Sequence, residues 1–173
     1  MFIFAVPNSP ALNLPVPEIT RLYGGDVRVR ACGICIRNEA VLLVNMKMYQ
    51  DGTPFWSPPG GGIEFGEPAV EALKREFLEE TGLEVEAGQL LFVNEHIRPP
   101  LHAIELFFEV TSFTKTVVKG FDPELQEQVI EEVRFFSMEE IRALPAAQIH
   151  TVFSGITSLS GLLKTSKLIS AKT

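Results

Sequence analysis

Three glutamates, Glu76, Glu79 and Glu80, stand at spacings of three and four residues in one short segment of this chain. At about 100° per residue, an α-helix would place their carboxylates within a sector of about 100°. Pro68 suits the first turn of such a helix, and Gly82 suits the position just after its last turn. The segment is therefore expected to be a helix with one strongly acidic side.

Like charges held this close repel one another unless a cation lies between them. Carboxylate oxygens without nearby Cys or His suit a hard cation, Mg²⁺ or Mn²⁺, better than zinc. The preceding run Ser57-Pro58-Pro59-Gly60-Gly61-Gly62 is a stiff turn followed by bare backbone, which can approach a metal or a phosphate closely. A merely solvated acidic face is the alternative, but the glycine run and both helix ends agree better with a metal site.

The same helix is expected to pack into a core through a neighbouring apolar stripe. Val70, Leu73 and Phe77 form this stripe at helical spacing. Ala69 and Ala72 are expected on the acidic side, where small side chains leave room beside the carboxylates.

The stretch from Gly61 to Leu83 resembles the Nudix box, the signature of hydrolases that act on nucleoside diphosphates linked to another moiety. The family pattern is glycine, five residues, glutamate, seven residues, and then Arg-Glu-bulky apolar-any-Glu-Glu-any-Gly-bulky apolar, and every specified position is filled here. The resemblance implies an α/β fold: an α/β/α sandwich with a central mixed β-sheet, in which the box forms a loop-helix-loop. The residues that carry the match are Gly61, Glu67, Arg75, Glu76, Phe77, Glu79, Glu80, Gly82 and Leu83.

The resemblance also implies roles for these residues. It places Glu76, Glu79 and Glu80 on Mg²⁺ or Mn²⁺, with the carbonyl oxygen of Gly61 as a further ligand. Other specified positions of the pattern have structural roles. The Glu67 and Arg75 positions orient the site, and Gly82 ends the helix.

The identity of the general base stays open at this point. In Nudix enzymes the base comes either from the box or from an acidic loop near the last strand. We favour Glu76 or Glu80, with Glu127 and Glu131 in the later loop as alternatives.

Composition favours one compact domain and excludes some partners. The chain has 173 residues, 46% of them hydrophobic, which is enough for a sizeable core. Its net charge of −7 argues against binding to a nucleic-acid polymer, which requires a basic surface. No apolar run is long enough for a transmembrane helix, and the apolar start lacks the basic region of a signal peptide, so we expect a cytoplasmic protein without membrane attachment.

The chain divides into three parts by pattern. Residues 25–145 are expected to form the Nudix domain, and residues 146–173 a weakly patterned C-terminal extension. Residues 1–24 contain too many prolines for a helix, yet are too apolar for a solvated tail. We expect this irregular segment to pack on the domain or on a partner in a homodimer, through Phe2, Ile3, Phe4, Leu12, Leu14 and Val16.

Within the domain, β-favouring runs alternate with turn signals. Strands are expected over residues 27–36 and 40–46, which would pair as a hairpin, and over 84–96, 103–113 and 132–136. A closing helix over 138–144 begins with a capping box formed by Ser137 and Glu140.

Cys32 and Cys35 are expected to be ordinary core residues. They lie three apart in a predicted strand and therefore point to opposite faces, and the chain has no second cysteine pair for a zinc site.

The substrate is expected to be a small nucleoside diphosphate derivative. Trp56 could stack on a base, and Arg30 and Arg98 could bind phosphates, although core packing and plain surface exposure are the alternatives. Gly62 stands where triphosphate-cleaning Nudix enzymes often carry lysine, and Pro99 stands where ADP-ribose-cleaving members often carry proline. These two positions tilt the prediction slightly towards ADP-ribose or a nucleotide sugar. A triphosphate pyrophosphohydrolase and a non-catalytic nucleotide sensor are the alternatives.

Overall fold

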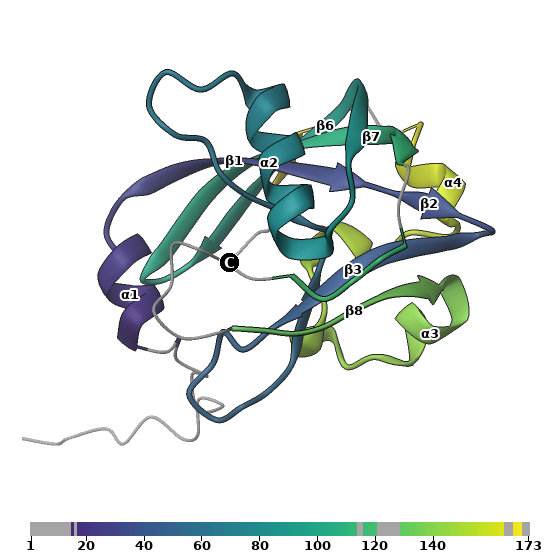
Figure 1. Cartoon of the computed structure of the whole chain (residues 1–173). Coiled ribbons are helices and arrows are strands. Elements are labelled where there is room, and N and C mark those ends of the chain that lie inside the picture. The colour runs from purple at the N-terminus through teal and green to yellow at the C-terminus, as the bar shows by residue number, and fades with distance from the viewer. Residues whose placement is uncertain (1–14, 16, 114–115, 121–128, 165–167, 171–173) are drawn as a thin grey trace, which may run out of the picture.

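The described strands form two β-sheets, of which the larger is mixed (Figure 1). The computed structural model describes residues 15, 17–113, 116–120, 129–164 and 168–170. In the five-stranded sheet, of order β5-β1-β7-β6-β9, the pairs β1–β7 and β6–β9 are parallel, and β1–β5 and β6–β7 are antiparallel. Its strands are β1 (Val27–Ile34), β5 (Gly60–Gly62), β6 (Val85–Arg98), β7 (Leu101–Phe113) and β9 (Leu168–Ser170).

The second sheet is antiparallel, with β3 paired to β2, β4 and β8. The predicted hairpin between residues 27–36 and 40–46 is correct only at its tip. Ile36 pairs with Val41, whereas β1 belongs to the other sheet, because the chain leaves that sheet at Cys35. An unbroken apolar run gives no sign of such a change of sheet. The strands of the second sheet are β2 (Ile36–Arg37), β3 (Ala40–Met46), β4 (Phe55–Ser57) and β8 (Ile130–Ser137).

Helices occur at both ends of the chain and in the box. The predicted box helix is present as α2 (Ala69–Thr81), and Gly82 ends it in the left-handed conformation with φ 68°. The predicted capping box is confirmed at α3 (Met138–Ala143), where the Glu140 amide donates to the Ser137 hydroxyl over 3.2 Å and the Ser137 amide donates to the Glu140 carboxylate over 2.8 Å. The remaining helices are α1 (Pro17–Tyr23), α4 (Leu159–Leu162) and the 3₁₀ turns η1 (Ala146–Gln148) and η2 (Thr151–Phe153).

The helix α1 corrects the expectation that residues 1–24 are irregular throughout. Proline is tolerated in the first helical turn, and Pro17 occupies that place, so the proline-rich part ends where α1 begins. Ile19 is buried and packs with Val44 and Ile130. The six apolar residues expected to anchor the segment, from Phe2 to Val16, lie outside the described residues.

One face of the sheets packs against α2. Leu73 and Phe77 are fully buried, as predicted, but Val70 is 37% exposed and Ala72 takes its place in the core. The side of α2 that faces the sheets is therefore rotated from the predicted stripe, and it carries Glu76 and Glu80 into the interior as well.

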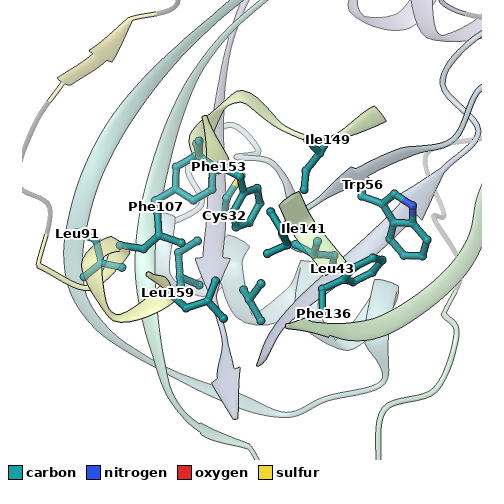
Figure 2. Packing of buried hydrophobic residues seen from close by; sticks show 14 of the residues in the cluster. Cys32, Leu43, Trp56, Leu91, Phe107, Phe136, Ile141, Ile149, Phe153 and Leu159 are labelled. Carbon is teal, nitrogen blue, oxygen red and sulfur yellow. The ribbon is translucent and has the colours of Figure 1, made fainter. Parts of the chain in front are cut away.

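The opposite face packs against the C-terminal segment. A cluster of buried hydrophobic residues fills this interface. Figure 2 shows Trp56, Leu43 and Phe136 of the cluster together with Ile149 and Phe153, which follow α3. Residues after position 145 therefore contribute directly to the main core, which their weak pattern did not indicate.

Adjacent residues of one strand belong to different clusters, because successive side chains point to opposite sides of a sheet. Phe107 packs with the C-terminal segment and Phe108 with α2. Cys32 and Cys35 divide in the same way, and both are buried free thiols, as predicted. Both faces are covered, which confirms the predicted α/β sandwich. Among the described helices, none is both long and apolar enough to cross a membrane.

Candidate active site

A pocket opens between the glycine strand β5, the acidic side of α2 and the strands β1, β6 and β7. Glu76 and Glu80 reach it from α2, and Gly60, Gly61 and Gly62 form its edge. The pocket therefore gathers two of the three predicted metal-binding glutamates and the predicted glycine loop. Glu79 does not line it.

The approach of β5 to α2 depends on the absence of side chains. The Gly60 amide donates to a carboxylate oxygen of Glu80 over 2.9 Å. A Cβ atom on Gly61 would collide with the carboxylate of Glu76, and one on Gly60, whose φ is +146°, would collide with the backbone of Ala31. Glycines at these positions therefore let backbone and carboxylates lie in direct contact.

Arg75 organises the acidic side of the box. Its Nε and Nη2 atoms donate to the two oxygens of Glu67, each over 3.0 Å, and Nη2 also donates to the carbonyl of Gly62 over 2.9 Å. Its Nη1 atom donates to Glu76 over 2.8 Å and to Glu79 over 3.3 Å. Arg75 thus joins the loop to the helix.

The carboxylate of Glu76 has an unusual environment. Burial raises the pKa of Glu76 from its ordinary 4.5 to about 7, although Arg75 partly opposes this shift. A cation bound beside the Glu76 carboxylate would stabilise its ionised form and lower this pKa.

Among the described residues, no three His, Cys, Asp or Glu side chains are gathered as a ready-made metal site. Glu76 and Glu79 are bound to the guanidinium of Arg75, which supplies positive charge between them. The donors that meet at the pocket edge are carboxylate and backbone oxygens, a set that fits Mg²⁺ or Mn²⁺.

The pocket wall contains a buried polar group that was not predicted from the sequence. Glu105, on β7, accepts hydrogen bonds from Arg30 over 3.1 Å and from Asn94 over 2.8 Å, and it lies 3.0 Å from Nε2 of His150. Burial alone would raise the pKa of Glu105, but His150, Arg30 and Asn94 together lower it well below its ordinary range. A glutamate inside the apolar run of residues 103–108 was the available signal.

His96 lies beside this group. Its ring stacks on that of His150 with 5.5 Å between centroids. Burial, together with His150, lowers the pKa of His96 from 6.5 to about 4, so its ring is neutral at pH 7.

The predicted substrate-binding residues divide between the pocket and other places. Arg30 lines the pocket. Trp56 is buried against Phe136, with 4.5 Å between ring centroids, and Arg98 packs over Tyr49 and donates to its hydroxyl. Because neither Trp56 nor Arg98 lines the pocket, we withdraw both as substrate contacts; the apolar neighbours of Trp56 outweighed its potential for stacking.

Neither of the alternative general bases, Glu127 and Glu131, is found among the described residues that line this pocket. Glu131 is exposed on β8 and is not a lining residue. Glu127 lies outside the described residues.

Comparisons with known proteins give a consistent family. A model of the NUDIX domain matches residues 27–154. Diphosphoinositol polyphosphate phosphohydrolase 3-alpha of Homo sapiens is 39% identical over 90 residues, which cover 50% of this chain and 53% of the relative. The m7GpppN-mRNA hydrolase NUDT17 of Danio rerio is 33% identical over 126 residues, which cover 70% of this chain and 41% of the relative. The chain thus spans about half the length of the curated relatives it matches.

Solved structures agree on the fold. A MutT NUDIX hydrolase from Burkholderia pseudomallei superposes with a TM-score of 0.59 at 25% identity, covering 71% of this chain and 93% of that one. An ADP-ribose pyrophosphatase from Streptococcus suis, at 18% identity, has the same fold with a TM-score of 0.52, covering 82% of this chain and 98% of that one. Since the NUDIX model accounts for most of the sequence, the chain belongs to the Nudix hydrolase family.

Proposed function

We propose that this protein hydrolyses a phosphoanhydride bond in a nucleoside diphosphate derivative, with Mg²⁺ or Mn²⁺ as cofactor. The observation that carries the proposal is the burial of Glu76 and Glu80 at a pocket edge made of bare glycine backbone. This edge offers carboxylate oxygens as ligands beside a bare backbone that a phosphate can approach closely.

Glu76, Glu79, Glu80 and the carbonyl of Gly61 would hold the cation. When bound, such a cation lowers the pKa of coordinated water and neutralises phosphate oxygens. Glu76 or Glu80 would take the proton of the attacking water, whose oxygen forms the new bond to phosphorus as the anhydride P–O bond breaks. Glu127 and Glu131 are the alternative bases. The products would be two phosphate-bearing fragments.

The remaining pocket wall supports a nucleoside as part of the substrate. Apolar side chains from several elements line it, which suits a flat base better than a highly charged group. The polyanion of an inositol phosphate would require many cations, whereas the arginines that line this pocket are Arg28 and Arg30, and Arg30 is already paired with Glu105. The apolar lining residues are Ile19, Tyr23, Met46, Met48, Phe55 and Leu101.

ADP-ribose or a nucleotide sugar is the substrate we favour, and a nucleoside triphosphate is the second candidate. A specific observation favours the second. Although Gly62 lacks the lysine typical of triphosphate-cleaning members, the Nη2 atom of Arg28 lies 3.0 Å from where a Cβ of residue 62 would be. A cation from β1 therefore lies beside position 62.

A substrate panel tests the function. We would incubate the protein and Mg²⁺ with ADP-ribose, a sugar nucleotide, nucleoside triphosphates, an mRNA cap analogue and a diphosphoinositol polyphosphate, and identify the products. We expect paired phosphate-bearing fragments, no activity after chelation, and recovery with Mg²⁺ or Mn²⁺. Full activity after exhaustive chelation contradicts the mechanism.

The same panel separates the alternatives. Triphosphates turned over at least about tenfold faster by kcat/KM, or about 1.4 kcal/mol, would reverse our order of substrates. Tight binding of a nucleotide without turnover would instead identify a sensor module, an outcome that the complete set of box carboxylates argues against.

A further inference from the structure

Glu105 and His150 form a buried pair at the base of the pocket. Their side chains are 1% and 3% exposed, and 3.0 Å separates the Glu105 carboxylate from Nε2 of His150. Neither residue belongs to the Nudix box, and His150 comes from the segment between η1 and η2, far along the chain from α2. Burying such groups is costly unless they are fully paired, so their joint presence requires a reason.

The contacts of His150 show which of its ring nitrogens accepts a hydrogen bond and which donates one. The amide of Val152 donates to Nδ1 of His150 over 3.3 Å, so Nδ1 is an acceptor without a proton. Nε2 is therefore the ring nitrogen that donates a hydrogen bond to Glu105. This leaves the negative charge of Glu105 to balance the positive charge of Arg30, whose Nη1 is 3.1 Å away.

Arg30 carries the connection onward to the glycine strand. Its Nη2 atom donates to the carbonyl of Gly60, and the amide of the same Gly60 donates to Glu80. Gly60 is thus held on both sides, by Arg30 from the pocket wall and by Glu80 from α2. The next residue, Gly61, packs directly on the carboxylate of Glu76.

We propose that Glu105 and His150 are positioning residues: together they hold Arg30 so that it fixes Gly60, and with it the glycine strand, against Glu76 and Glu80. The inference rests on the proposed function in one respect, namely that this strand and these glutamates hold the divalent cation. Replacing a residue that hydrogen-bonds to a metal ligand without touching the metal typically lowers metal affinity or activity by about 10- to 100-fold.

The first variant that tests this is Glu105→Gln, which keeps the shape of the side chain but removes its charge. The second is His150→Phe, which keeps a ring but removes the Nε2 donor, with His150→Gln as a conservative partner that can still donate. Val152→Ala is the matched control, since Val152 is buried in the same segment and has no polar side-chain atoms. Each protein is first checked for a cooperative thermal transition.

The main measurement is Mn²⁺ binding without substrate, followed by electron paramagnetic resonance of the free ion. We expect Glu105→Gln and His150→Phe to raise the Mn²⁺ dissociation constant at least about tenfold and to lower kcat, with KM within about twofold of the original value. His150→Gln should bind more tightly than His150→Phe. Val152→Ala should lower Tm without changing Mn²⁺ affinity.

Several results would overturn the proposal. It fails if the folded Glu105→Gln protein binds Mn²⁺ within twofold of the unaltered protein, or if Val152→Ala weakens binding as much as His150→Phe. If Glu105→Gln does not fold, the comparison of the two His150 variants decides alone. If the Mn²⁺ affinities follow the expected order but the panel shows no hydrolysis, the proposed function fails and the positioning role stands.

Discussion

Glu79 has different surroundings from the other two carboxylates of α2. Its side chain is 26% exposed and binds Arg75, whereas Glu76 and Glu80 are buried at the pocket. If it is nevertheless a metal ligand, Glu79→Gln should reduce kcat by at least about 100-fold, because removing a key electrostatic group from a catalytic site has this effect. Steady-state kinetics would show this, with Glu71→Gln on the same helix as control, since the Glu71 side chain is 60% exposed. A loss below about threefold would exclude Glu79 from the ligands.

His96 should make stability depend on pH. The pKa of His96 is about 4 in the folded protein and 6.5 in the unfolded chain, because burial disfavours its charged form. Between these values the unfolded chain binds a proton on His96 that the folded protein does not, so the contribution of His96 to the free energy of unfolding falls as pH is lowered from 6.5 to 4. The loss is no more than about 3 kcal/mol.

Urea unfolding at several pH values would measure this dependence. The free energy of unfolding of the unaltered protein, minus that of His96→Gln, should fall as pH is lowered across this range. Parallel curves for the two proteins would mean that His96 is not the group responsible.

Individual residues were predictable where the motif fixes their role. The contacts of Glu67 and Arg75 follow from the box itself, since all their partners lie between residues 62 and 79. Glu105 was not predictable, because its partners Arg30 and His150 come from distant parts of the chain. No local pattern shows that such residues will meet.

At the scale of elements, the glycine strand β5 has no room for side chains at Gly60 and Gly61. Gly61→Ala should lower kcat at least about tenfold and reduce stability by about 1–3 kcal/mol, because the new methyl group forces apart β5 and the carboxylate of Glu76. Kinetics and thermal unfolding would measure both effects. Gly161→Ala is the control, since a Cβ there meets only the Ser158 hydroxyl at 3.4 Å. Equal activity in both variants would show that the close approach of β5 to α2 is unimportant.

The elements predicted best are those with a strong local pattern. Strand β3 has the predicted bounds, and α2 was expected from its spacing and its ends. The prediction failed where tertiary contacts decide, as at Cys35, where the chain changes sheets, and at α1, whose single buried residue, Ile19, gives no helical period. The segment after residue 145 likewise owes its structure to the core that it covers.

At the scale of the whole molecule, the N-terminal segment remains predicted to support a homodimer. A protein beginning at Gly24 lacks α1 and loses the contacts of Ile19 with Val44 and Ile130. We therefore expect the shortened protein to have lower thermal stability. In light scattering it should be a monomer, whereas the longer chain should be a dimer. If both proteins are equally stable monomers, the segment is dispensable and the dimer prediction is wrong.

The wall of the pocket draws on parts of the chain outside the box and far from it. Tyr23 comes from α1, before the region matched by the family model, and His150 comes from near the end of that region. On the proposed function, Tyr23 would contact the substrate and the box would hold the cation, so these two tasks fall to different stretches of sequence. Changes in the α1 stretch would then alter which molecule binds while the glycine strand and its glutamates stay intact, so a family of this kind can diversify without rebuilding its chemistry.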